Sequence, residues 1–599
     1  MISVFQKQRM IEVAMGKRPA ELVITGGKIV NVFTGEIYEA DIAVSGGLIC
    51  GVGNYSGGKT RGEKTLDAAG AYICPGLIDA HFHIESTRAT PREVIRHALA
   101  HGNTAFIADP HEIANVLGLE GIGYMMFETE NVPFGAYFAA PSCVPSSKHE
   151  DNGAVIGPAD LEKLACLPRM VALGEMMDAP AVVLGGKSEL EKIEAFGSKP
   201  VDGHITGTGA KDDLKTLNAY FAAGIMSNHE CNDAQDAIAQ LRLGAYVQVR
   251  QGSAAKNAAG LLAVIKESGV SLRRLLLCTD DKHIEDIAKR GLTVEPLRIA
   301  VEQGIDPVAA VQMATINAAD AYGLRHIGAI APGRYADLVF FSDLKDFNVE
   351  KVFYRGELVS ENGSLPDVSP LNSSDYLRQT MKMRYVTEFD IKLKVGKMAR
   401  IINLVPGELT TFETREKVPQ ISGIFKPDKK YAKLCVVERH KATGKIGLGI
   451  VKGFGISGGC IASTVAHDSH NFIAASDNDG DMLLAIDAVN RMGGGMAVVS
   501  GGEIKARMPL PIAGLMSDAP FEELKRQAEE IEAAARALGI PEGIEPFMNL
   551  SFLSLTAIGD IRLTARGLYD VKRQKFAEIS PKARSIFKKH GAKAEGKKQ

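Results

Sequence analysis

The sequence predicts an α/β protein built on a (β/α)8 barrel of the TIM type, with a small β-sandwich domain and a C-terminal α+β domain. Eight apolar, strand-like runs alternate with helical stretches over about 250 residues, which is typical of a parallel sheet covered by helices. Acids and histidines follow several of these runs, as in barrel enzymes. A glycine-punctuated, β-branched pattern precedes the barrel and returns after it, which indicates one β domain assembled from both flanks.

Short apolar runs separated by glycines predict the flanking β domain. These runs are residues 22–24, 28–30, 41–44, 336–341 and 352–356. Glycine pairs such as Gly26-Gly27 and the Pro332-Gly333 dipeptide are turn signals between such runs. We therefore expect residues 1–70 and 326–375 to form one β-sandwich domain around the inserted barrel.

The barrel is expected to span residues 71–325. Its strand candidates are residues 71–79, 104–109, 134–144, 171–176, 200–204, 225–229, 245–250 and 275–280. Helical stretches between them include residues 91–100, 160–165, 212–223 and 255–267. Eight such units match a closed barrel better than an open doubly wound sheet.

The character of the sequence changes again after about residue 375. Strand-like runs at 434–438 and 446–451 mix with helical periodicities at 481–492 and 521–538. A separate α+β domain over residues 376–599 is the simplest account of this mixture.

Composition excludes several classes of protein. Of the 599 residues 45% are hydrophobic and 24% are charged, which excludes a disordered, collagenous or coiled-coil chain. The net charge of −3 leaves no basic excess for nucleic acid or a membrane surface, and the basic stretch at 582–598 is expected to be a solvated tail. No apolar run is long enough for a membrane helix. Residues 1–12 lack a signal-peptide pattern, so we expect a cytoplasmic enzyme.

Potential metal ligands fall at the carboxyl ends of five predicted barrel strands. His81 and His83 follow strand 1 two residues apart, and this spacing points both imidazoles the same way in an extended chain. The ends of strands 4, 5, 6 and 8 carry Glu175, His204, His229 and Asp280. A single histidine at a strand end is most often an ordinary core or surface residue. Six potential ligands at the ends of five strands of one barrel favour a metal site.

Four histidines and two carboxylates suit two adjacent divalent metal ions, because one tetrahedral ion uses fewer ligands. Glu175 is the natural bridge, since it is the only acid inside the strand 4 segment. Such a pair lowers the pKa of a shared water molecule toward neutrality. Asp280 is expected to take the proton of that water and pass it to a leaving group, so Glu175 and Asp280 are the catalytic candidates.

Several motifs carry a resemblance to a known family. They are residues 75–83 (Pro-Gly-Leu-Ile-Asp-Ala-His-Phe-His), 81–86, 108–115, 172–177, 333–339 and 465–471. With these motifs the chain resembles the amidohydrolase superfamily and, over nearly its whole length, the bacterial adenine deaminase family. Several superfamily branches bridge their metals with a carboxylated lysine at the end of strand 4. Glu175 at this position argues against a dihydroorotase or a hydantoinase.

The resemblance implies hydrolytic attack on C6 of free adenine, which yields hypoxanthine and ammonia in purine salvage. It implies manganese or iron as the metal, although histidine and carboxylate ligands also permit zinc. A homo-oligomer is expected by analogy. The closest rival is a hydrolase of a cyclic amide or another aminopurine on the same scaffold. A metal-free barrel retained for binding or assembly is a rival of another class.

Adenine is flat and uncharged, so hydrogen-bonding side chains are expected near the metals. Glu85 and Ser86, just past the histidine pair, are the first candidates. Asp281, next to Asp280, is either a substrate acid or the cap of the following helix.

Two further groups of residues are lower-ranked candidates for the site. Asp109, His111 and Glu112 lie beyond strand 2 and are expected to contact the base or another ion, the alternative being a structural turn. His467 and His470 lie in the C-terminal domain. They are expected to close over the active site from this or a neighbouring subunit, the alternative being that they satisfy a buried turn.

Overall fold

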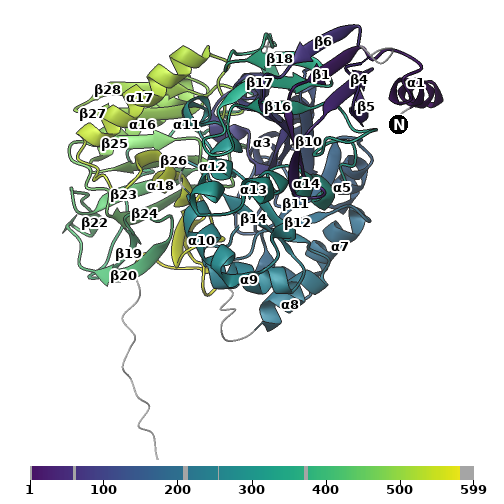
Figure 1. The fold of residues 1–599 in the computed structure, drawn as a ribbon. Helices are drawn as coiled ribbons and strands as arrows, with labels where there is room; N and C mark the ends of the chain where they lie inside the picture. Colours follow the sequence, from purple (N-terminus) through teal and green to yellow (C-terminus); the bar gives the residue numbers. More distant parts are fainter. Residues whose placement is uncertain are drawn as a thin grey trace, which may run out of the picture.

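The computed structural model describes residues 3–57, 62–206, 214–253, 255–369, 371 and 375–580. Figure 1 shows the purple N-terminal sheets, the blue to teal barrel, and the green to yellow C-terminal domain beside the barrel. The predicted fold class is confirmed. The basic stretch at 582–598 and residues 212–213 of one predicted helix lie outside the described residues.

Eight parallel strands form the closed barrel. They are β8 (Leu77–Phe82), β9 (Asn103–Ala108), β10 (Gly135–Ala140), β11 (Met170–Met176), β12 (Val201–Gly203), β13 (Ser227–Asn228), β14 (Tyr246–Arg250) and β15 (Leu275–Cys278). They pair as two arcs, β8 to β12 and β13 to β15. Backbone hydrogen bonds join the arcs, from Met226 N to Val201 O (2.9 Å) and from Asp280 N to His81 O (3.0 Å).

The barrel interior is filled by side chains and is not a pore. Its buried members are mostly small and come from several strands, namely Ile78, Ala80, Ala105, Ile107, Ala139, Ala172, Leu276 and Cys278. A filled interior leaves the strand ends as the place where polar chemistry is possible.

Helices surround the strands (Figure 1). They are α2 (Pro91–Ala100), α3 (His111–Leu117), α4 (Leu119–Glu128), α5 (Pro158–Ala165), α6 (Ala179–Val183), α7 (Lys187–Ala195), α8 (Lys215–Ala222), α9 (Ala234–Arg242), α10 (Ala258–Ser268), α11 (Ile284–Arg290), α12 (Val294–Glu302), α13 (Pro307–Met313) and α14 (Ile316–Ala321). The helix α2 has the predicted bounds. It begins with proline at its first position, where a missing N–H costs nothing, and it buries an apolar face.

The first predicted strand, residues 71–79, is two strands in the structure. The strand β7 (Tyr72–Pro75) pairs with β2 (Lys28–Asn31) and β16 (Leu338–Phe341), while β8 begins at Leu77. Gly76 separates them, and a Cβ there would lie 2.0 Å from Thr104 Oγ1. His81 therefore lies inside strand 1 of the barrel and not beyond it.

The sandwich consists of two sheets that share an apolar core. One has the order β5 (Leu48–Gly53), β4 (Asp41–Ser45), β1 (Leu22–Thr25), β6 (Lys64–Asp67). The other has the order β18 (Glu357–Glu361), β17 (Val349–Tyr354), β16, β7, β2, β3 (Glu36–Glu39). Ile24, Ile73 and Leu338 pack in the shared core, so residues from both sides of the barrel complete one domain. The helix α1 (Val4–Ala14) contacts this domain through Val13.

The C-terminal domain is an eight-stranded sheet between helices. Its order is β20 (Thr411–Glu416), β19 (Ala399–Leu404), β24 (Ile446–Lys452), β23 (Ala432–Val437), β26 (Phe472–Ser476), β25 (Gly459–Ser463), β27 (Gly495–Ser500), β28 (Glu503–Pro509). The helices α16 (Asp479–Arg491) and α17 (Phe521–Ala537) lie close to the predicted bounds, and their apolar residues pack with opposite faces of the strands. The remaining elements are α15 (Asp375–Arg378), α18 (Pro546–Phe552), and the strands β21 (Gln420–Ile421), β22 (Ile424–Phe425), β29 (Ile561–Thr564), β30 (Gly567–Asp570) and β31 (Lys575–Phe576).

The segment between β25 and β26, residues 464–471, reaches the barrel, and we call it the C-terminal loop. Asn471 Nδ2 donates a hydrogen bond to the backbone oxygen of Asp151 in the barrel (2.8 Å). Among the described residues, no helix has both the length and the apolar character that crossing a bilayer requires.

Candidate active site

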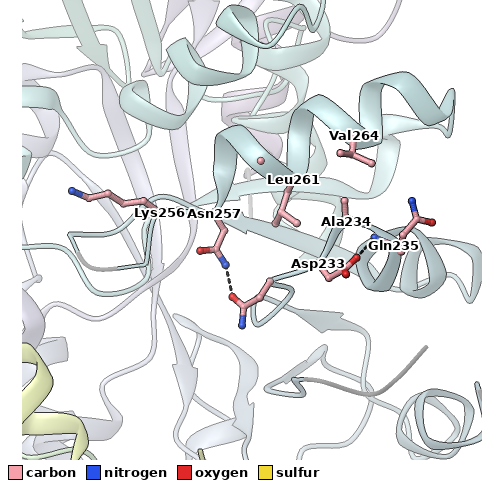
Figure 2. Close-up of a pocket in the computed structure, with 9 residues that line it drawn as sticks. Asp233, Ala234, Gln235, Lys256, Asn257, Leu261 and Val264 are labelled. Atoms are coloured by element: carbon pink, nitrogen blue, oxygen red, sulfur yellow. Dashed lines mark hydrogen bonds between the residues drawn. The ribbon is translucent and has the colours of Figure 1, made fainter. Parts of the chain in front are cut away.

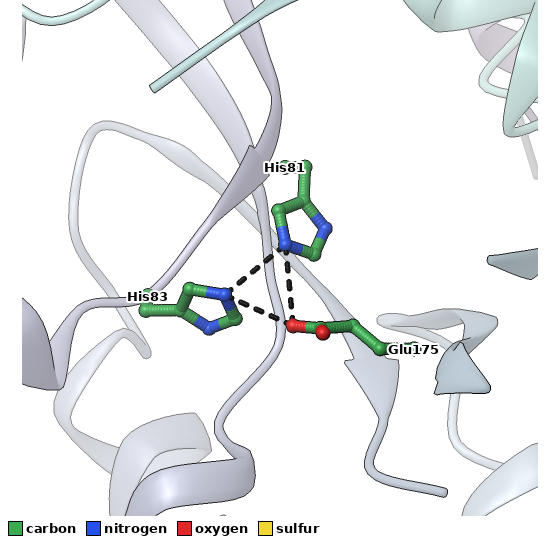
Figure 3. A group of neighbouring side chains, drawn as sticks. All are labelled: His81, His83 and Glu175. Atoms are coloured by element: carbon green, nitrogen blue, oxygen red, sulfur yellow. Dashed lines mark hydrogen bonds and ion pairs between the residues drawn. The ribbon is translucent and has the colours of Figure 1, made fainter. Parts of the chain in front are cut away.

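The carboxyl ends of the barrel strands bring the six predicted ligands into one buried group. His83 Nε2 lies 3.0 Å from Glu175 Oε1 and 3.1 Å from Asp280 Oδ1. His81 Nε2 lies 3.4 Å from the same Glu175 oxygen (Figure 3). His204 and His229 approach Glu175 from the other side. The structure therefore places all six side chains around one point of the rim.

Glu175 stands between two pairs of histidines. Its Oε1 faces His81 and His83, whereas its Oε2 lies 2.7 Å from His204 Nδ1 and 3.6 Å from His229 Nε2. Each carboxylate oxygen thus has its own pair among these four imidazoles, and His111 Nδ1 also lies 3.5 Å from Oε1. This is the arrangement that a carboxylate bridging two cations requires.

The donor set fits divalent metal ions. The nitrogen and oxygen atoms of three overlapping trios lie within 4.8 Å of one another, and the trios are His81, His83, Glu175; His81, His229, Asp280; and Glu175, His204, His229. Ligand atoms that share a tetrahedral ion at about 2.1 Å are roughly 3.4 Å apart. The distances of 2.7–3.6 Å around Glu175 match that spacing.

The short distances between these histidines and carboxylates also determine their protonation states in the metal-free protein. Burial opposes the charged form of every group, but the facing histidines hold the pKa of Glu175 well below its usual range. Despite burial, the carboxylates of Asp202 and Glu175 raise the pKa of His81 to about 10. His204, beside Glu230 and Glu175, has its pKa raised to about 9. A compact group of opposite charges remains when no cation is bound.

Further contacts orient the ligands. His81 Nδ1 lies 2.9 Å from Asp202 Oδ2, and His83 Nδ1 lies 3.0 Å from the backbone oxygen of Asp109. Asp109 Oδ2 also accepts a hydrogen bond from the backbone N–H of Glu175 (3.0 Å). This contact needs a glycine at 174, where a Cβ would lie 2.1 Å from the same oxygen. Such contacts fix the ring orientation of metal-binding histidines.

A second cluster gathers the predicted substrate residues that follow strands 1, 2 and 8. Ser86 Oγ hydrogen-bonds Glu112 Oε1 (2.7 Å) and Asp281 Oδ1, while Glu85 Oε1 accepts from Ile113 N (3.0 Å). Burial raises the pKa of Glu85 to about 7 and, with the nearby Glu85 and Asp281 carboxylates, raises that of Glu112 well above its usual range. The raised pKa values favour the protonated forms of both carboxyl groups.

The alternative in which Asp281 caps a helix is wrong. The next helix, α11, begins at Ile284, and its N-cap residue is His283. Asp281 instead joins Ser86 and Glu112 in the second cluster.

The C-terminal loop of the same chain covers this cluster. His470 Nε2 lies 3.7 Å from Glu112 Oε2, and these two residues form a buried trio with His467. His111 lies between the loop and the metal-ligand group, with Nδ1 3.5 Å from Glu175 Oε1 and Nε2 3.8 Å from Asp468 Oδ1. All eight lower-ranked candidates therefore lie around the same rim as the six predicted ligands.

Sequence reasoning missed four polar residues of the site. Asp202 lies in β12 two residues before His204, and Glu230 directly follows His229, so their positions at strand ends were a usable signal for both. Arg250 ends β14 and contacts Asp280, and the same rule applied to it. Asp468 lies between the candidates His467 and His470 in the motif at 465–471, so that motif was its signal, although only the packing of the C-terminal domain brings it to His111.

Family models and curated relatives match this chain over most of its length. The amidohydrolase family model matches residues 72–359, and the model of the adenine deaminase C-terminal domain matches residues 408–575. An adenine deaminase of Nitratidesulfovibrio vulgaris (strain DP4) is 44% identical over 576 residues, covering 95% of this chain and 98% of that protein. Adenine deaminase 2 of Carboxydothermus hydrogenoformans is 41% identical over 574 residues, covering 95% and 99%. Among solved structures, β-aspartyl dipeptidase of Fervidobacterium islandicum AW-1 is 14% identical, covers 58% of this chain and 99% of its own, and has a TM-score of 0.45.

Proposed function

Because the chain belongs to the adenine deaminase family, we propose that it is a hydrolase that converts free adenine and water to hypoxanthine and ammonia. The observation that carries the proposal is the position of Glu175 between two pairs of histidines, in a chain that matches its relatives over 95% of its length.

We further propose that His81, His83, Glu175, His204, His229 and Asp280 hold two divalent metal ions. When bound, such a pair lowers the pKa of a shared water molecule and supplies a nucleophile at neutral pH. Manganese or iron is the proposed metal, and the same donors accept zinc. The split of the two Glu175 oxygens between separate histidine pairs supports its role as the bridge.

Asp280 and Glu175 are the proposed catalytic residues. Asp280 Oδ1 faces the histidine pair, so it can hold the proton of the attacking water and deliver it to the departing amino group. The water oxygen ends on C6, and the amino nitrogen leaves as ammonia. Glu175 keeps the two halves of the ligand group at a fixed separation.

The second cluster is the proposed binding site of the base. Adenine offers ring nitrogens as hydrogen-bond acceptors, and the attack at C6 makes the adjacent nitrogen more negative. Glu85 and Glu112 can donate to such nitrogens in their protonated forms, which burial favours by raising the pKa of both groups. Ser86 and Asp281 orient Glu112. On the opposite side, His467 and His470 form the wall, and Asp109 and His111 lie between the base and the ligands.

We place the reaction in purine salvage in the cytoplasm, with a homo-oligomer as the working form. The support for the oligomer is analogy alone. The absence of a membrane-crossing helix among the described residues is consistent with this placement.

The test is ammonia release from adenine by protein reconstituted with manganese, with metals counted on the same sample by elemental analysis. We expect turnover together with about two metals per chain. Two metals with ring opening of hydantoins and no adenine turnover would move the assignment to a cyclic-amide hydrolase. A chain that binds no metal and releases no ammonia after reconstitution would contradict the mechanism.

A further inference from the structure

We propose that Arg250 is a positioning residue for Asp280. Its guanidinium holds one carboxylate oxygen, so that the other faces the metal-binding histidines. The inference rests on the proposed function. It assigns a role to the seventh barrel strand, which supplies none of the six proposed ligands.

The two oxygens of Asp280 have different neighbours. Oδ2 accepts a hydrogen bond from Arg250 Nη1 at 2.9 Å. Oδ1 lies 3.1 Å from His83 Nε2 and 3.8 Å from His81 Nε2. A carboxylate is symmetric and its terminal torsion is broad, so nothing within Asp280 itself distinguishes the two atoms. Contact with Arg250 makes that distinction.

The guanidinium is itself held in one plane. Both of its terminal nitrogens pair with Glu230, with Nη2 3.1 Å from Oε2, and Nη2 also lies 3.3 Å from Asn232 Oδ1. Two parallel hydrogen bonds to one carboxylate give geometric specificity that a lysine does not reproduce. Because Glu230 balances the charge of Arg250, Asp280 keeps its negative charge available for a cation.

The outer end of this network reaches the protein surface. Asn232 Oδ1 accepts a hydrogen bond from Asn257 Nδ2 at 2.5 Å, and both residues line a cavity of about 590 Å³ (Figure 2). Arg250 is thus held by the buried carboxylate of Glu230 and by Asn232, which is exposed, and it also contacts Asp280.

A purely structural arginine in this protein has different partners. Arg562, fully buried in the C-terminal domain, donates to the backbone oxygens of Ile558 (2.7 Å) and Leu409 (2.9 Å). Arg250 hydrogen-bonds side-chain oxygens beside the proposed metal site. Side-chain partners at the proposed metal site indicate that Arg250 orients the proposed ligand Asp280 more than it stabilises the fold. Arg562, whose partners are backbone oxygens, is the matched control.

The experiment compares Arg250→Ala, Arg250→Lys and Arg562→Ala with the unmodified chain. Manganese affinity is measured by chelator competition without adenine, and kcat and KM for adenine are measured at saturating manganese. For Arg250→Ala we expect affinity to fall by about 10–100-fold, with kcat reduced by about tenfold or more and KM changed by less than about threefold. Added guanidinium should raise the kcat of Arg250→Ala by at least about fivefold. Arg562→Ala should lower Tm while leaving affinity and the guanidinium response unchanged.

Unchanged manganese affinity and kcat in a folded Arg250→Ala protein would overturn the proposal. So would losses that guanidinium does not relieve. If Arg250→Ala fails to fold, Arg250→Lys decides the question, because it keeps the charge and changes the geometry. It should lose about fivefold or more in kcat, and full kcat would overturn the proposal. Manganese affinity is measured without substrate. A chain that does not deaminate adenine would therefore contradict the proposed function, and the manganese affinity of Arg250→Ala would still decide the role of Arg250.

Discussion

The barrel rim and the C-terminal loop form opposite walls of one site, and they differ in how their polar atoms are used. On the rim, His81 and Asp280 each have a further partner that orients them, Asp202 and Arg250, whereas His204 Nε2 and His229 Nδ1 have none among the described residues. On the loop side, Asp468 Oδ2 and His470 Nε2 are buried, and neither hydrogen-bonds to any described residue. Buried polar atoms usually have partners, so such atoms indicate a wall that is completed by a ligand.

The protonation states of the two walls differ in the same way. Neighbouring histidines and Arg250 hold the pKa of Asp280 well below its usual range in spite of burial. Burial, together with the charges of Glu150 and Glu175, raises the pKa of Asp468 well above its usual range. On the rim, Asp280 thus presents an anion suited to a cation, whereas the protonated form is favoured for Asp468 on the loop side and for Glu85 and Glu112 in the second cluster, which suits an uncharged base. We expect substitutions on the two walls to have different effects.

The largest effect is expected on the rim. Glu175→Gln removes the charge that faces both histidine pairs, so metal content and turnover should fall together, with turnover reduced by about 10³-fold or more. Elemental analysis and ammonia release on one sample measure both quantities. Two retained metals with full turnover would show that Glu175 is not the bridge.

An intermediate effect is expected on the loop side. Asp468→Ala removes a group that contacts no proposed metal ligand, so KM for adenine should rise by about tenfold while metal content stays constant. Asp477→Ala is the control, because that carboxylate accepts hydrogen bonds from Gly458 and Gly459 within the same domain. Lost metal in Asp468→Ala, or an equal rise in KM for the control, would remove the distinction between the two walls.

The smallest effect is expected from pH in the metal-free protein. In the folded state the pKa of His81 is about 10 and that of His204 about 9, above the unfolded value of about 6.5. Their contribution to stability is fully present below pH 6.5 and is lost as pH rises through 9–10. Between pH 7 and 10, Tm should therefore fall by a few degrees more without metal than with it. Parallel Tm curves for the two forms would contradict these charge states.

Much of the fold could be predicted, because local signals and tertiary packing agree in the barrel. The helix α2 combines a proline start with an apolar face, and its bounds were predicted correctly. The prediction of one strand at 71–79 was wrong, because this continuous apolar stretch contributes to two sheets. The part before Gly76 pairs in the sandwich and the part after it pairs in the barrel. The Pro75-Gly76 dipeptide in that run is a turn signal, but it does not reveal the change of partner, since the partner strand β16 lies more than 250 residues away.

Contacts between distant parts of the chain also limited the prediction of the site. The six ligands could be proposed because strand ends converge at one rim whatever the loops do. The contact between His111 and Asp468 depends on how a separate domain packs against the barrel, and no local pattern encodes that packing. Arg250 was overlooked for a different reason, because an arginine is not a metal ligand although it ends a barrel strand.

The pairing of β7 with β16 sets an order of events during synthesis. Residues 72–75 must wait for residues 338–341 to leave the ribosome before their sheet can be completed. At about 5–20 residues per second this interval is roughly 13–50 s. During that time the apolar faces of β2 and β7 have only part of their sheet, and the whole barrel emerges between the two halves of the sandwich. A nascent chain released before residue 341 would lack the strand that joins those halves and would expose surfaces prone to aggregation.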